Sequence, residues 1–585
     1  MIKTKLALWV AAACITLNAA AAQQGNFQGR EDREPEAKTG YSEKQAVVAE
    51  EFMVVAANPY ASWAGRRVIE KGGSAIDAAI AIQAMLTLVE PQSSGIGGGA
   101  FILYWDNEEK KLHTYDGREM APAKVDQYLF TEQGKPMKWR DAVVGGKSVG
   151  VPGAIKALEL AHQEFGQLEW QTLFTDTIET ATKGFTVSPR LHKLLALDIH
   201  PGLRAFPASK NYFFPAGQPL QAGDNKKNPA LAKTLTGLAI QGADYFYLGD
   251  LPKKIEKAVQ TVSINPGLLT ADDFAAYTAI KRAPICGAYR NKQVCGMAPP
   301  SSGGINVLQI LKQLDQFNIA EMGPNSADFA HVYTQSTAMA YADRNQFVAD
   351  TDFTKLPYAA LINDTYLTRR ADNIAPNSNM RKFSAGQPYT NAQLGIDQSI
   401  EAPNTSHISI VDKQGNAVSM TTSIEFMFGS GLMVDGFLLN NQLTDFSLAP
   451  SVNGRPILNR VEPGKRPRSA MSPTVMFDED GELELVVGSP GGSRIISYVA
   501  QTIIGVVDWQ MDVQQAINLP KITNRNDYTA LEKGTPVEGI AEQLTSKGHN
   551  VRLVDLNSGL HGIQIVDGKL VGGADPRREG VAVGN

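Results

Sequence analysis

The spacing of apolar residues changes along this chain, and the change falls near residue 405. Helical periodicity marks four segments before that point: 61–88, 150–280, 305–317 and 329–345. A strand is predicted at 101–105, and the periodicity fades over 376–403, where Asn, Pro, Ser and Gly accumulate. The first part of the chain is therefore expected to be rich in helices and to end in a long loop.

Short strands dominate the rest of the pattern. Apolar and polar residues alternate over 406–411 and 417–423, on either side of a turn. Further strands are predicted at 437–440 and 483–487, and an apolar helix at 494–509. This order predicts an α/β fold in which stacked sheets are covered by helices, rather than a parallel sheet of the nucleotide-binding type.

The hairpin after residue 404 carries hydroxyl side chains at its open end. Centring its turn on Gln414 gives three opposite pairs: Val411 and Ala417, Ile408 and Met420, Thr405 and Ser423. Two hydroxyls then face each other, and Glu425 projects on the same face as Ser423 if the strand continues that far. The alternative is a solvent-facing edge, where Thr and Ser are ordinary strand residues.

Composition and charge exclude some partners. The chain has 585 residues, 43% of them hydrophobic and 20% charged, which is a globular composition with ample length for a large core. The formal net charge is −5 and no basic cluster stands out, so nucleic acid is not an expected partner.

The N-terminus has the pattern of an export signal. Two lysines precede an apolar run from Leu6, and small residues follow at Ala20–Ala22. This predicts a signal peptide over 1–22 and a periplasmic or secreted protein; an uncleaved membrane anchor is the alternative, but the run is short for a span of ~20 residues. Residues 23–46 are polar and are expected to form a mobile leader. No membrane span is expected after the signal is removed.

Two cysteines remain in the mature chain. If Arg290 and Asn291 form a two-residue turn, the flanking strands place Cys286 opposite Cys295. An exported chain can oxidise such a pair, so a disulfide is expected. Two free buried thiols are the alternative.

Two glycine-rich segments invite different interpretations. Residues 95–100 match GxGxxA, but a helix precedes them and a strand follows, the reverse of a dinucleotide site, so close backbone approach is the better explanation. Residues 488–494 join a strand to a helix, where backbone N–H groups can hold an oxyanion. A tight turn or a phosphate site are alternatives, although a P-loop is excluded because no Lys-Ser/Thr follows the glycines.

No histidine is an obvious base for the hydroxyls. The eight histidines are scattered, and His407 beside the hydroxyls could equally be a packed strand residue. A threonine without a histidine can still be a nucleophile if its own α-amine is free to act as base. That requires a cut before Thr405, which the long loop ending at Asn404 would allow.

At this point the motifs become specific. Thr405-Ser-His-Ile-Ser and the segment 415–425 closely resemble the signature of the γ-glutamyltranspeptidases. Further similar motifs follow in family order: Gly72-Gly-Ser-Ala-Ile-Asp, Ser94-Gly-Ile-Gly-Gly-Gly, Gly117-Arg-Glu-Met-Ala-Pro, Pro299-Pro-Ser-Ser-Gly-Gly, Tyr341-Ala-Asp-Arg, Asn440-Asn-Gln-Leu-Thr-Asp, Lys465-Arg-Pro and Gly488-Ser-Pro-Gly-Gly-Ser. The resemblance covers nearly the whole mature chain.

The resemblance implies a self-cutting N-terminal nucleophile hydrolase. Its fold would be a four-layer αββα sandwich formed jointly by two subunits, 47–404 and 405–585, after a cut between Asn404 and Thr405. By position, Thr405 is the nucleophile, Ser423 orients it, Gly491 and Gly492 bind the oxyanion, Arg118 and Ser469 bind the α-carboxylate, and Glu425, Gln442 and Asp445 bind the α-ammonium. Locally, Arg118 could instead pair with Glu119, and Asp445 could cap a turn.

This chain departs from the family pattern in three places. Ser469-Ala470 stands where the family often has two serines, so one donor to the carboxylate is lost. Several members have Asn where Glu425 stands, and the extra carboxylate should strengthen the hold on an ammonium. The segment 446–468 is shorter than in members with a full lid and has no Tyr, which predicts a more open pocket.

The implied function is γ-glutamyl transfer and glutathione hydrolysis without a metal or organic cofactor. The expected partners are glutathione and other γ-glutamyl compounds, with amino acid or peptide acceptors and a large–small subunit heterodimer. One alternative is a related glutaryl or cephalosporin acylase, whose substrate lacks an α-ammonium. Another is a non-catalytic periplasmic binding protein, which has no need for a free N-terminal Thr.

Overall fold

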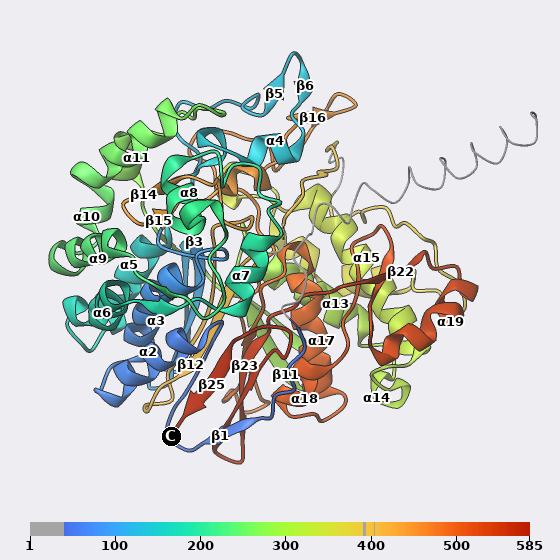
Figure 1. Ribbon diagram of the computed structural model, residues 1–585. Coiled ribbons are helices and arrows are strands. Elements are labelled where there is room, and N and C mark those ends of the chain that lie inside the picture. Colours follow the sequence, from blue (N-terminus) through green and yellow to red (C-terminus); the bar gives the residue numbers. More distant parts are fainter. Residues whose placement is uncertain (1–39, 390–392, 403) are drawn as a thin grey trace, which may run out of the picture. The chain divides into compact units, whose positions relative to one another are not determined.

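Two seven-stranded sheets run through the computed structural model, which describes residues 40–389, 393–402 and 404–585 (Figure 1). The first sheet has the strand order β1 (Val47–Ala49), β24 (Lys569–Ala574), β23 (His561–Val566), β19 (Leu483–Gly488), β18 (Thr474–Phe477), β11 (Lys292–Gly296), β10 (Ile285–Tyr289). The second has the order β25 (Val581–Gly584), β2 (Met53–Ala56), β12 (Ser406–Val411), β13 (Ala417–Ser423), β3 (Gly99–Asp106), β4 (Lys111–Gly117), β9 (Ile280–Lys281). Neighbouring strands in both sheets are antiparallel, so the fold is mixed α/β without a nucleotide-type parallel sheet.

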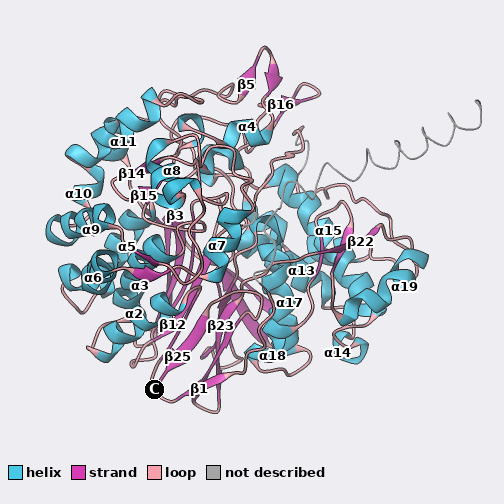
Figure 2. Ribbon diagram, in the orientation of Figure 1, coloured by secondary structure: helices cyan, strands magenta, loops and turns pink. Residues whose placement is uncertain are grey.

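Helices pack against both sheets (Figure 2). The helices that contact the second sheet include α2 (Pro59–Glu70), α3 (Ala75–Val89) and α5 (Ala154–Phe165). Those that contact the first sheet include α13 (Gly303–Leu314), α17 (Ile495–Val507) and α18 (Val513–Asn518). Each sheet therefore buries an apolar face under its own helices.

The remaining helices and small sheets surround these layers. The other α-helices are α4 (Trp139–Val143), α6 (Thr175–Lys183), α7 (Pro189–Ala196), α8 (Pro207–Phe213), α9 (Pro229–Gln241), α10 (Asp244–Tyr247), α11 (Asp250–Thr261), α12 (Ala271–Ala276), α14 (Ile319–Met322), α15 (Ala327–Phe347), α16 (Asp364–Ala371) and α19 (Ala541–Ser546). The small sheets pair β5 (Thr131–Glu132) with β6 (Lys135–Pro136), β7 (Phe185–Thr186) with β8 (Asn225–Lys226), β14 (Met433–Val434) with β15 (Phe437–Leu438), β16 (Ser451–Val452) with β17 (Arg455–Pro456), and join β20 (Ile522–Asn524), β21 (Thr529–Glu532) and β22 (Val551–Val554).

The hairpin of β12 and β13 lies in the middle of the second sheet and is buried throughout. Its apolar residues Ile408 and Met420 belong to the core shared with α2 and α3. On the opposite face, Ser409 Oγ donates to the His561 carbonyl and Ser419 Oγ to the Val487 carbonyl, both at 3.2 Å, which links the two sheets. Ser409 and Ser419 therefore lie between the sheets. Because Thr405 and Ser423 are buried as well, the alternative of a solvent-facing edge is wrong.

The helical pattern predicted over 61–88 is interrupted. Helix α2 ends at Glu70 and α3 begins at Ala75. Gly72 between them has φ +89°, which ends the first helix, and Ser74 caps the second by accepting a hydrogen bond from Asp77 N while Asp77 accepts from Ser74 N. The apolar periodicity of the sequence runs across this break, so it did not show that glycine and the capping residues separate two helices.

The glycines before β3 serve close backbone approach, as the sequence predicted. A Cβ atom on Gly98 would lie 2.0 Å from the carbonyl oxygen of Ser423, which is closer than any real contact. Helix α3 precedes this segment and β3 follows, so the order of elements excludes the dinucleotide motif. The glycine lets the end of β13 pass close to the turn before β3.

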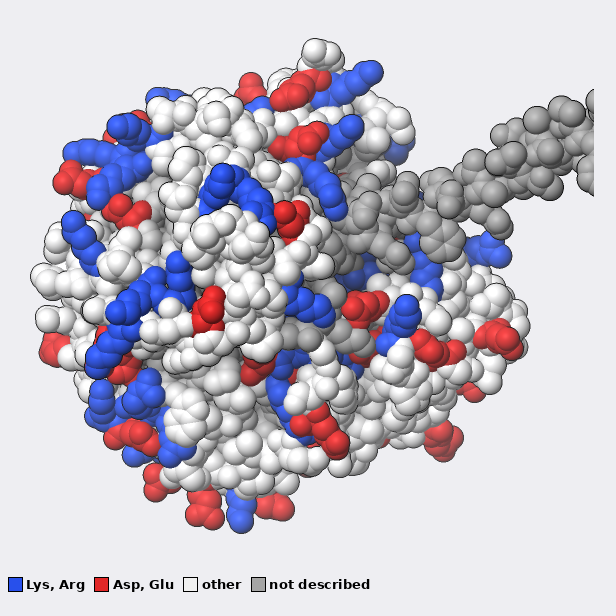
Figure 3. All heavy atoms as spheres, in the orientation of Figure 1, with Lys and Arg blue, Asp and Glu red and all other residues white. Residues whose placement is uncertain are grey.

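The expected signal peptide lies outside the described residues, as does most of the predicted leader. The end of the leader has defined contacts, because Lys44 Nζ donates to the carbonyls of Asp575, Arg578 and Gly580. On the face of the molecule shown in Figure 3, basic and acidic side chains are interspersed rather than gathered by sign. Within the described residues, no helix is long and apolar enough to cross a membrane.

Candidate active site

The predicted nucleophile is bonded to its predicted partner in the uncut chain. Strand pairing joins Ser406 to Thr422, which is the register expected from the turn. One step further out, Thr405 Oγ1 donates to Ser423 Oγ at 3.2 Å. Ser423 Oγ in turn donates to the carbonyl oxygen of Asn404 at 2.8 Å. The side chain that faces Thr405 therefore also holds the carbonyl that precedes Thr405.

Glu425 reaches the same site by a turn and not by strand alternation. Strand β13 ends at Ser423, and Glu425 has φ +77°. Its backbone N–H donates to Ser423 Oγ at 2.9 Å. The expectation that the strand runs on to Glu425 was wrong, because the chain enters a left-handed conformation there, yet the side chain still lies at the hydroxyl end of the hairpin.

The Glu425 carboxylate is buried and already has partners. Its Oε1 accepts a hydrogen bond from the backbone N–H of Ala402 at 3.0 Å, and its Oε2 accepts from Asn441 Nδ2. Burial, and then the negative charge of Asp445, raise the pKa of Glu425 well above its usual value. A cation placed between these two carboxyl groups would favour their ionised forms.

Arg118 and Asp445 form a buried ion pair. Arg118 Nη2 donates to Asp445 Oδ2 at 2.6 Å, and Gln442 Nε2 donates to the same oxygen at 2.8 Å. Arg118 Nε and Nη2 also donate to the carbonyls of Pro467 and Arg468, while Nη1 has no hydrogen-bond partner among the described residues. Burial raises the pKa of Asp445 to about 6, although the charge of Arg118 acts in the opposite direction. Arg118 lies behind Asp445, and its spare donor is Nη1, which lies 3.5 Å from Glu119.

Ser469 is held by the segment after the Pro299–Pro300 peptide. Its backbone N–H donates to the Pro300 carbonyl at 2.9 Å, and its carbonyl accepts from the N–H and hydroxyl of Ser302. Its own Oγ accepts from Met471 N at 3.1 Å. The Ser469 hydroxyl is therefore fixed at the rim of the site, next to the apolar Ala470.

Gly491 and Gly492 lie where strand β19 gives way to α17, as the sequence predicted. Both have positive φ, +136° and +55°. A Cβ atom on Gly492 would lie 2.6 Å from the carbonyl oxygen of Glu401 and 2.7 Å from that of Ala402. The segment Glu401–Ala402, which lies shortly before Asn404, is therefore packed directly against this glycine.

These groups surround one small cavity of about 20 Å³, the space of roughly one water molecule. It is lined by Glu401, Ala402, Thr405, Ser423, Glu425, Gln442, Asp445, Ser469, Ala470, Met471, Gly492 and Ile495. Seven of the residues predicted for the site are in this lining, and Arg118, Asn404 and Gly491 are not. The structure thus brings residues of the long loop, the hairpin and the glycine turn together.

Sequence reasoning missed the residues that fill and support the cavity. Glu401 lies inside it and pairs with Arg344 Nη2, while Arg468 Nε lies 3.6 Å from the same carboxylate oxygen. Asn441 supports Glu425. Arg344 ends the Tyr341-Ala-Asp-Arg motif and Arg468 directly follows Lys465-Arg-Pro, but neither motif indicated that the two arginines share a partner.

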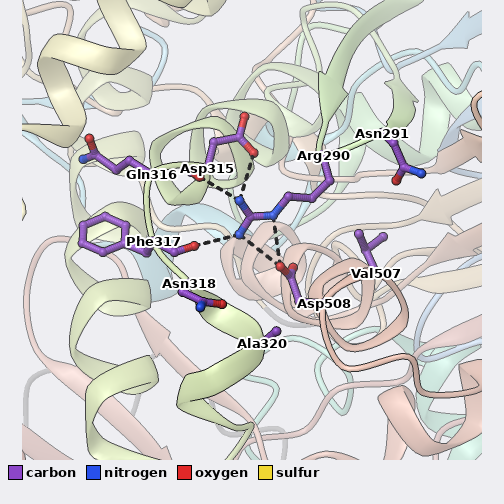
Figure 4. A pocket seen from close by; sticks show the side chains of 9 residues that line it. All are labelled: Arg290, Asn291, Asp315, Gln316, Phe317, Asn318, Ala320, Val507 and Asp508. Carbon is purple, nitrogen blue, oxygen red and sulfur yellow. Dashed lines mark hydrogen bonds and ion pairs between the residues drawn. The ribbon is translucent and has the colours of Figure 1, made fainter.

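Cys286 and Cys295 form a disulfide between the last two strands of the first sheet. Strands β10 and β11 place Cys286 directly opposite Cys295, and the two sulfur atoms are bonded. This is the pairing that the hairpin register predicted. The same hairpin borders a surface hollow of about 510 Å³ (Figure 4). Its Arg290 donates hydrogen bonds to the Asp508 carboxylate and to the carbonyls of Asp315 and Phe317, so this guanidinium group is already paired.

The cavity contains no set of side chains typical of a metal site. Across the described ranges, no group of three or more His, Cys, Asp or Glu side chains is arranged to hold a metal ion. His407, the histidine nearest the hydroxyls in sequence, is buried and contacts Thr421 and Ser409 through its ring nitrogens. Burial lowers the pKa of His407 well below its usual value, which is typical of a packed neutral histidine rather than of a general base.

Comparisons with known proteins show the family to which the chain belongs. A family model described as gamma-glutamyltranspeptidase matches residues 61–585. The chain is 36% identical over 555 residues to a glutathione hydrolase proenzyme from Bacillus subtilis (strain 168), with 92% of each chain covered. It is 36% identical over 542 residues to a glutathione hydrolase proenzyme from Escherichia coli (strain K12), with 91% of each covered.

A solved structure supports the fold assignment. The structure of a cephalosporin acylase from Bacillus halodurans superposes with a TM-score of 0.82 at 26% identity, covering 94% of this chain and 99% of that one. The family model covers most of the chain, and the two proenzymes match it over nearly their full length. This chain therefore belongs to the γ-glutamyltranspeptidase family.

Proposed function

We propose that this chain is the precursor of a γ-glutamyltransferase and glutathione hydrolase that cuts itself between Asn404 and Thr405. One observation carries the proposal: the Thr405 hydroxyl bonds to Ser423, whose hydroxyl bonds to the carbonyl that Thr405 would attack. Family membership and the glutathione hydrolase proenzymes among the relatives support the same activity.

The cut proceeds by an acyl shift. Thr405 Oγ1 attacks the Asn404 carbonyl carbon, the bond between that carbon and the Thr405 nitrogen breaks, and the nitrogen takes up the hydroxyl proton. Ser423 donates its hydrogen bond to the oxygen on which negative charge develops. Water then hydrolyses the ester and leaves a carboxylate on Asn404, a free α-amine on Thr405 and its restored hydroxyl.

The two fragments remain one folded body. They are a large subunit, 47–404, and a small subunit of 181 residues, 405–585 (585 − 404). Each sheet already contains strands from both sides of the cut: β12 lies between β2 and β13, and β18 lies between β11 and β19. In our proposal the heterodimer is the four-layer αββα sandwich of N-terminal nucleophile hydrolases.

Turnover uses the groups that the cut sets free. Thr405 attacks the γ-carbonyl of a γ-glutamyl amide, and its own α-amine takes the hydroxyl proton and passes it to the leaving amine. The N–H groups of Gly491 and Gly492 stabilise the oxyanion. The γ-glutamyl ester on Thr405 is then transferred to water or to the amine of an amino acid or peptide.

The donor is held through the two charged groups on its α-carbon, the ammonium and the carboxylate. Glu425, Gln442 and Asp445 bind the α-ammonium, and Arg118 and Ser469 bind the α-carboxylate. Glu425 and Asp445 are both buried with raised pKa values, so a cation in the cavity stabilises their ionised forms. The short segment 446–468 leaves the entrance open to water and to large acceptors.

We place the enzyme in the periplasm or outside the cell, since the sequence begins with a pattern typical of a cleaved signal peptide. Its chemistry needs neither a metal nor an organic cofactor, because the nucleophile, the base and the oxyanion donors all come from the chain. The Cys286–Cys295 disulfide agrees with an oxidising compartment.

An acylase for glutaryl side chains is the nearest rival, given the structural similarity to a cephalosporin acylase. Its substrate has no α-ammonium, whereas three polar groups suited to an ammonium line this cavity. Turnover of a γ-glutamyl anilide compared with its glutaryl analogue tests the choice. Preference for the γ-glutamyl compound is expected, whereas preference for the glutaryl compound would assign the chain to the acylases. An uncut chain that turns over neither compound would favour a binding protein.

A further inference from the structure

Two buried arginines converge on the carboxylate of Glu401, a residue that lines the cavity. Arg344, from helix α15, donates from Nη2 to Glu401 Oε1, and Arg468 Nε lies 3.6 Å from the same oxygen. Arg468 Nε and Glu401 Oε2 are buried and have no hydrogen-bond partner among the described residues. Burial alone raises the pKa of Glu401, but Arg344 and Arg468 outweigh it and bring the pKa below its usual value. Glu401 is therefore an ionised side chain held by two guanidinium groups.

The arginines are fixed without Glu401. Arg344 Nε donates to Ser302 Oγ at 2.7 Å, and Arg468 Nη1 donates to the Arg344 carbonyl at 3.1 Å. Arg468 Nη2 lies 2.9 Å from Asp397 Oδ2. Both guanidinium groups would thus keep their positions if the Glu401 carboxylate moved away, and Arg344 Nη2 and Arg468 Nε would then face the space that it had occupied.

The segment that carries Glu401 resembles the donor group in its chemistry. Glu401 contributes a carboxylate, and the next residue, Ala402, contributes an N–H that donates to Glu425. A γ-glutamyl group also carries a carboxylate and an N–H donor on one carbon, its α-carbon. Glu401 and Ala402 line the same cavity as Thr405 and Ser423. The uncut chain therefore fills the site with groups of the kind that the proposed donor would bring.

The cavity is too small to hold both occupants. It measures about 20 Å³ with Glu401 and Ala402 in place, roughly one water molecule. A γ-glutamyl group cannot enter until these residues leave, and the cut at Asn404 releases their end of the chain. Removal of Glu401 would leave Arg344 without its carboxylate and Arg468 with Asp397 alone, which costs free energy unless another carboxylate replaces it.

We propose that Arg344 and Arg468 form a carboxylate-binding pair in the donor site, which Glu401 fills in the uncut chain and the α-carboxylate of a γ-glutamyl donor fills after the cut. The inference rests on the proposed function and adds two substrate-binding residues to it. It also explains how the site manages with Ala470, which has no hydroxyl, and with an Arg118 that is largely engaged by Asp445.

Binding of two ligands to the cut enzyme tests the pair. L-Glutamate carries the α-carboxylate, and L-isoglutamine replaces it by a neutral carboxamide. We expect Arg468→Met to weaken L-glutamate binding by about 30-fold, because one partner of a buried charge pair is lost. The affinity for L-isoglutamine should stay within about threefold of wild type. Calorimetric titration of both ligands measures the two dissociation constants, and Arg66→Met, which removes a surface ion pair with Glu70 on α2, is the matched control.

The outcomes separate this inference from the proposed function. Equal weakening of both ligands, or of neither, would overturn the arginine pair even if wild-type enzyme turns over γ-glutamyl anilide normally. Wild-type protein that lacks this turnover but shows the Arg468-dependent preference for L-glutamate would overturn the activity and leave the pair standing. If Arg468→Met is not cut, Arg344→Lys and Arg468→Lys supply the same comparison, with a charge retained and the guanidinium fork removed; selective loss of L-glutamate affinity supports the pair, and unchanged affinity contradicts it.

Discussion

The hydroxyl of Ser423 donates a hydrogen bond to the carbonyl oxygen of Asn404 at 2.8 Å while it accepts one from Thr405 at 3.2 Å. One side chain thus connects the proposed nucleophile to the carbonyl that it would attack in the proposed cut. The contact depends on the register of β12 and β13, because Thr405 lies one residue before Ser406 and Ser423 one residue after Thr422. The proposed autocatalytic step therefore depends on the register of the β12–β13 hairpin.

Removal of the Ser423 hydroxyl should slow the cut strongly. Ser423→Ala loses the hydrogen bond to the oxygen where charge develops, and we expect autocleavage about 100-fold slower than in wild type. Ser423→Thr keeps the hydroxyl and should be cut at a rate close to that of wild type. A time course on a denaturing gel measures both rates. Ser419→Ala removes a hydroxyl from the same strand that bonds to the Val487 carbonyl, and serves as the control. A Ser423→Ala chain cut as fast as this control would refute the role.

Neutralising Glu425 should weaken the binding of donors that carry an α-ammonium and leave the binding of other donors unchanged. Glu425→Gln removes one of the two carboxylates at the cation end of the cavity, so KM for γ-glutamyl anilide should rise by about 10- to 100-fold. KM for the glutaryl analogue should stay the same or fall. Steady-state kinetics of both substrates measures the split, with Glu482→Gln at the exposed ion pair with Lys110 as the control. A parallel rise for both substrates would mean that Glu425 supports the fold rather than the ammonium.

Acid should destabilise the uncut chain through its buried histidines. Burial, followed by the charge of Lys44, lowers the pKa of His561 to about 3, compared with about 6.5 in an unfolded chain. The stability from keeping His561 neutral is fully present above pH 6.5 and is lost as the pH falls toward 3. Between pH 7.5 and pH 5 this amounts to about 2 kcal/mol of unfolding free energy.

The substitution His561→Gln isolates this contribution. In the uncut Thr405→Ala background, the fall in unfolding free energy from pH 7.5 to pH 5 should be smaller by about 2 kcal/mol than in the parent. Urea unfolding at the two pH values measures it. An identical fall in both proteins would show that His561 is not the titrating group.

The disulfide should stabilise the edge of the first sheet without affecting the chemistry. Cys286 and Cys295 are nine residues apart, and closing so short a loop contributes about 2–3 kcal/mol. The double variant Cys286→Ala/Cys295→Ala should unfold at a lower temperature but still be cut at the wild-type rate. Thermal unfolding and the gel time course check the two statements. Unchanged thermal stability would show that the crosslink does not contribute to the fold.

Local sequence rules predicted part of this structure correctly. Strict alternation and a compact turn determined the pairing of Val411 with Ala417, and hence the meeting of Thr405 and Ser423. The same rule failed two residues later, because the left-handed conformation of Glu425 ends the strand and alternation has no meaning beyond it. The helix predicted over 61–88 failed at Gly72, where a backbone conformation interrupts an otherwise continuous apolar pattern.

Local sequence rules could not predict that Glu401 lines the cavity. Glu401 meets Arg344 across 57 residues of chain and approaches Arg468 from a different element, and no spacing or composition links the three. Their association arises only when helix α15, the long loop and the segment before Ser469 pack together. A charged residue in a loop is expected to be exposed, so no local pattern predicted Glu401 at a buried cavity.

The self-cutting of the chain is tested most directly by the intact mass of purified, active protein beside that of the Thr405→Ala variant. If the chain cuts itself, the wild type gives two fragments, the smaller with 181 residues and beginning at Thr405 (585 − 404), and Thr405→Ala stays a single uncut chain without turnover of γ-glutamyl anilide. Full activity in a wild-type preparation that contains only the uncut chain would contradict it, and so would a Thr405→Ala chain that is cut at the same bond.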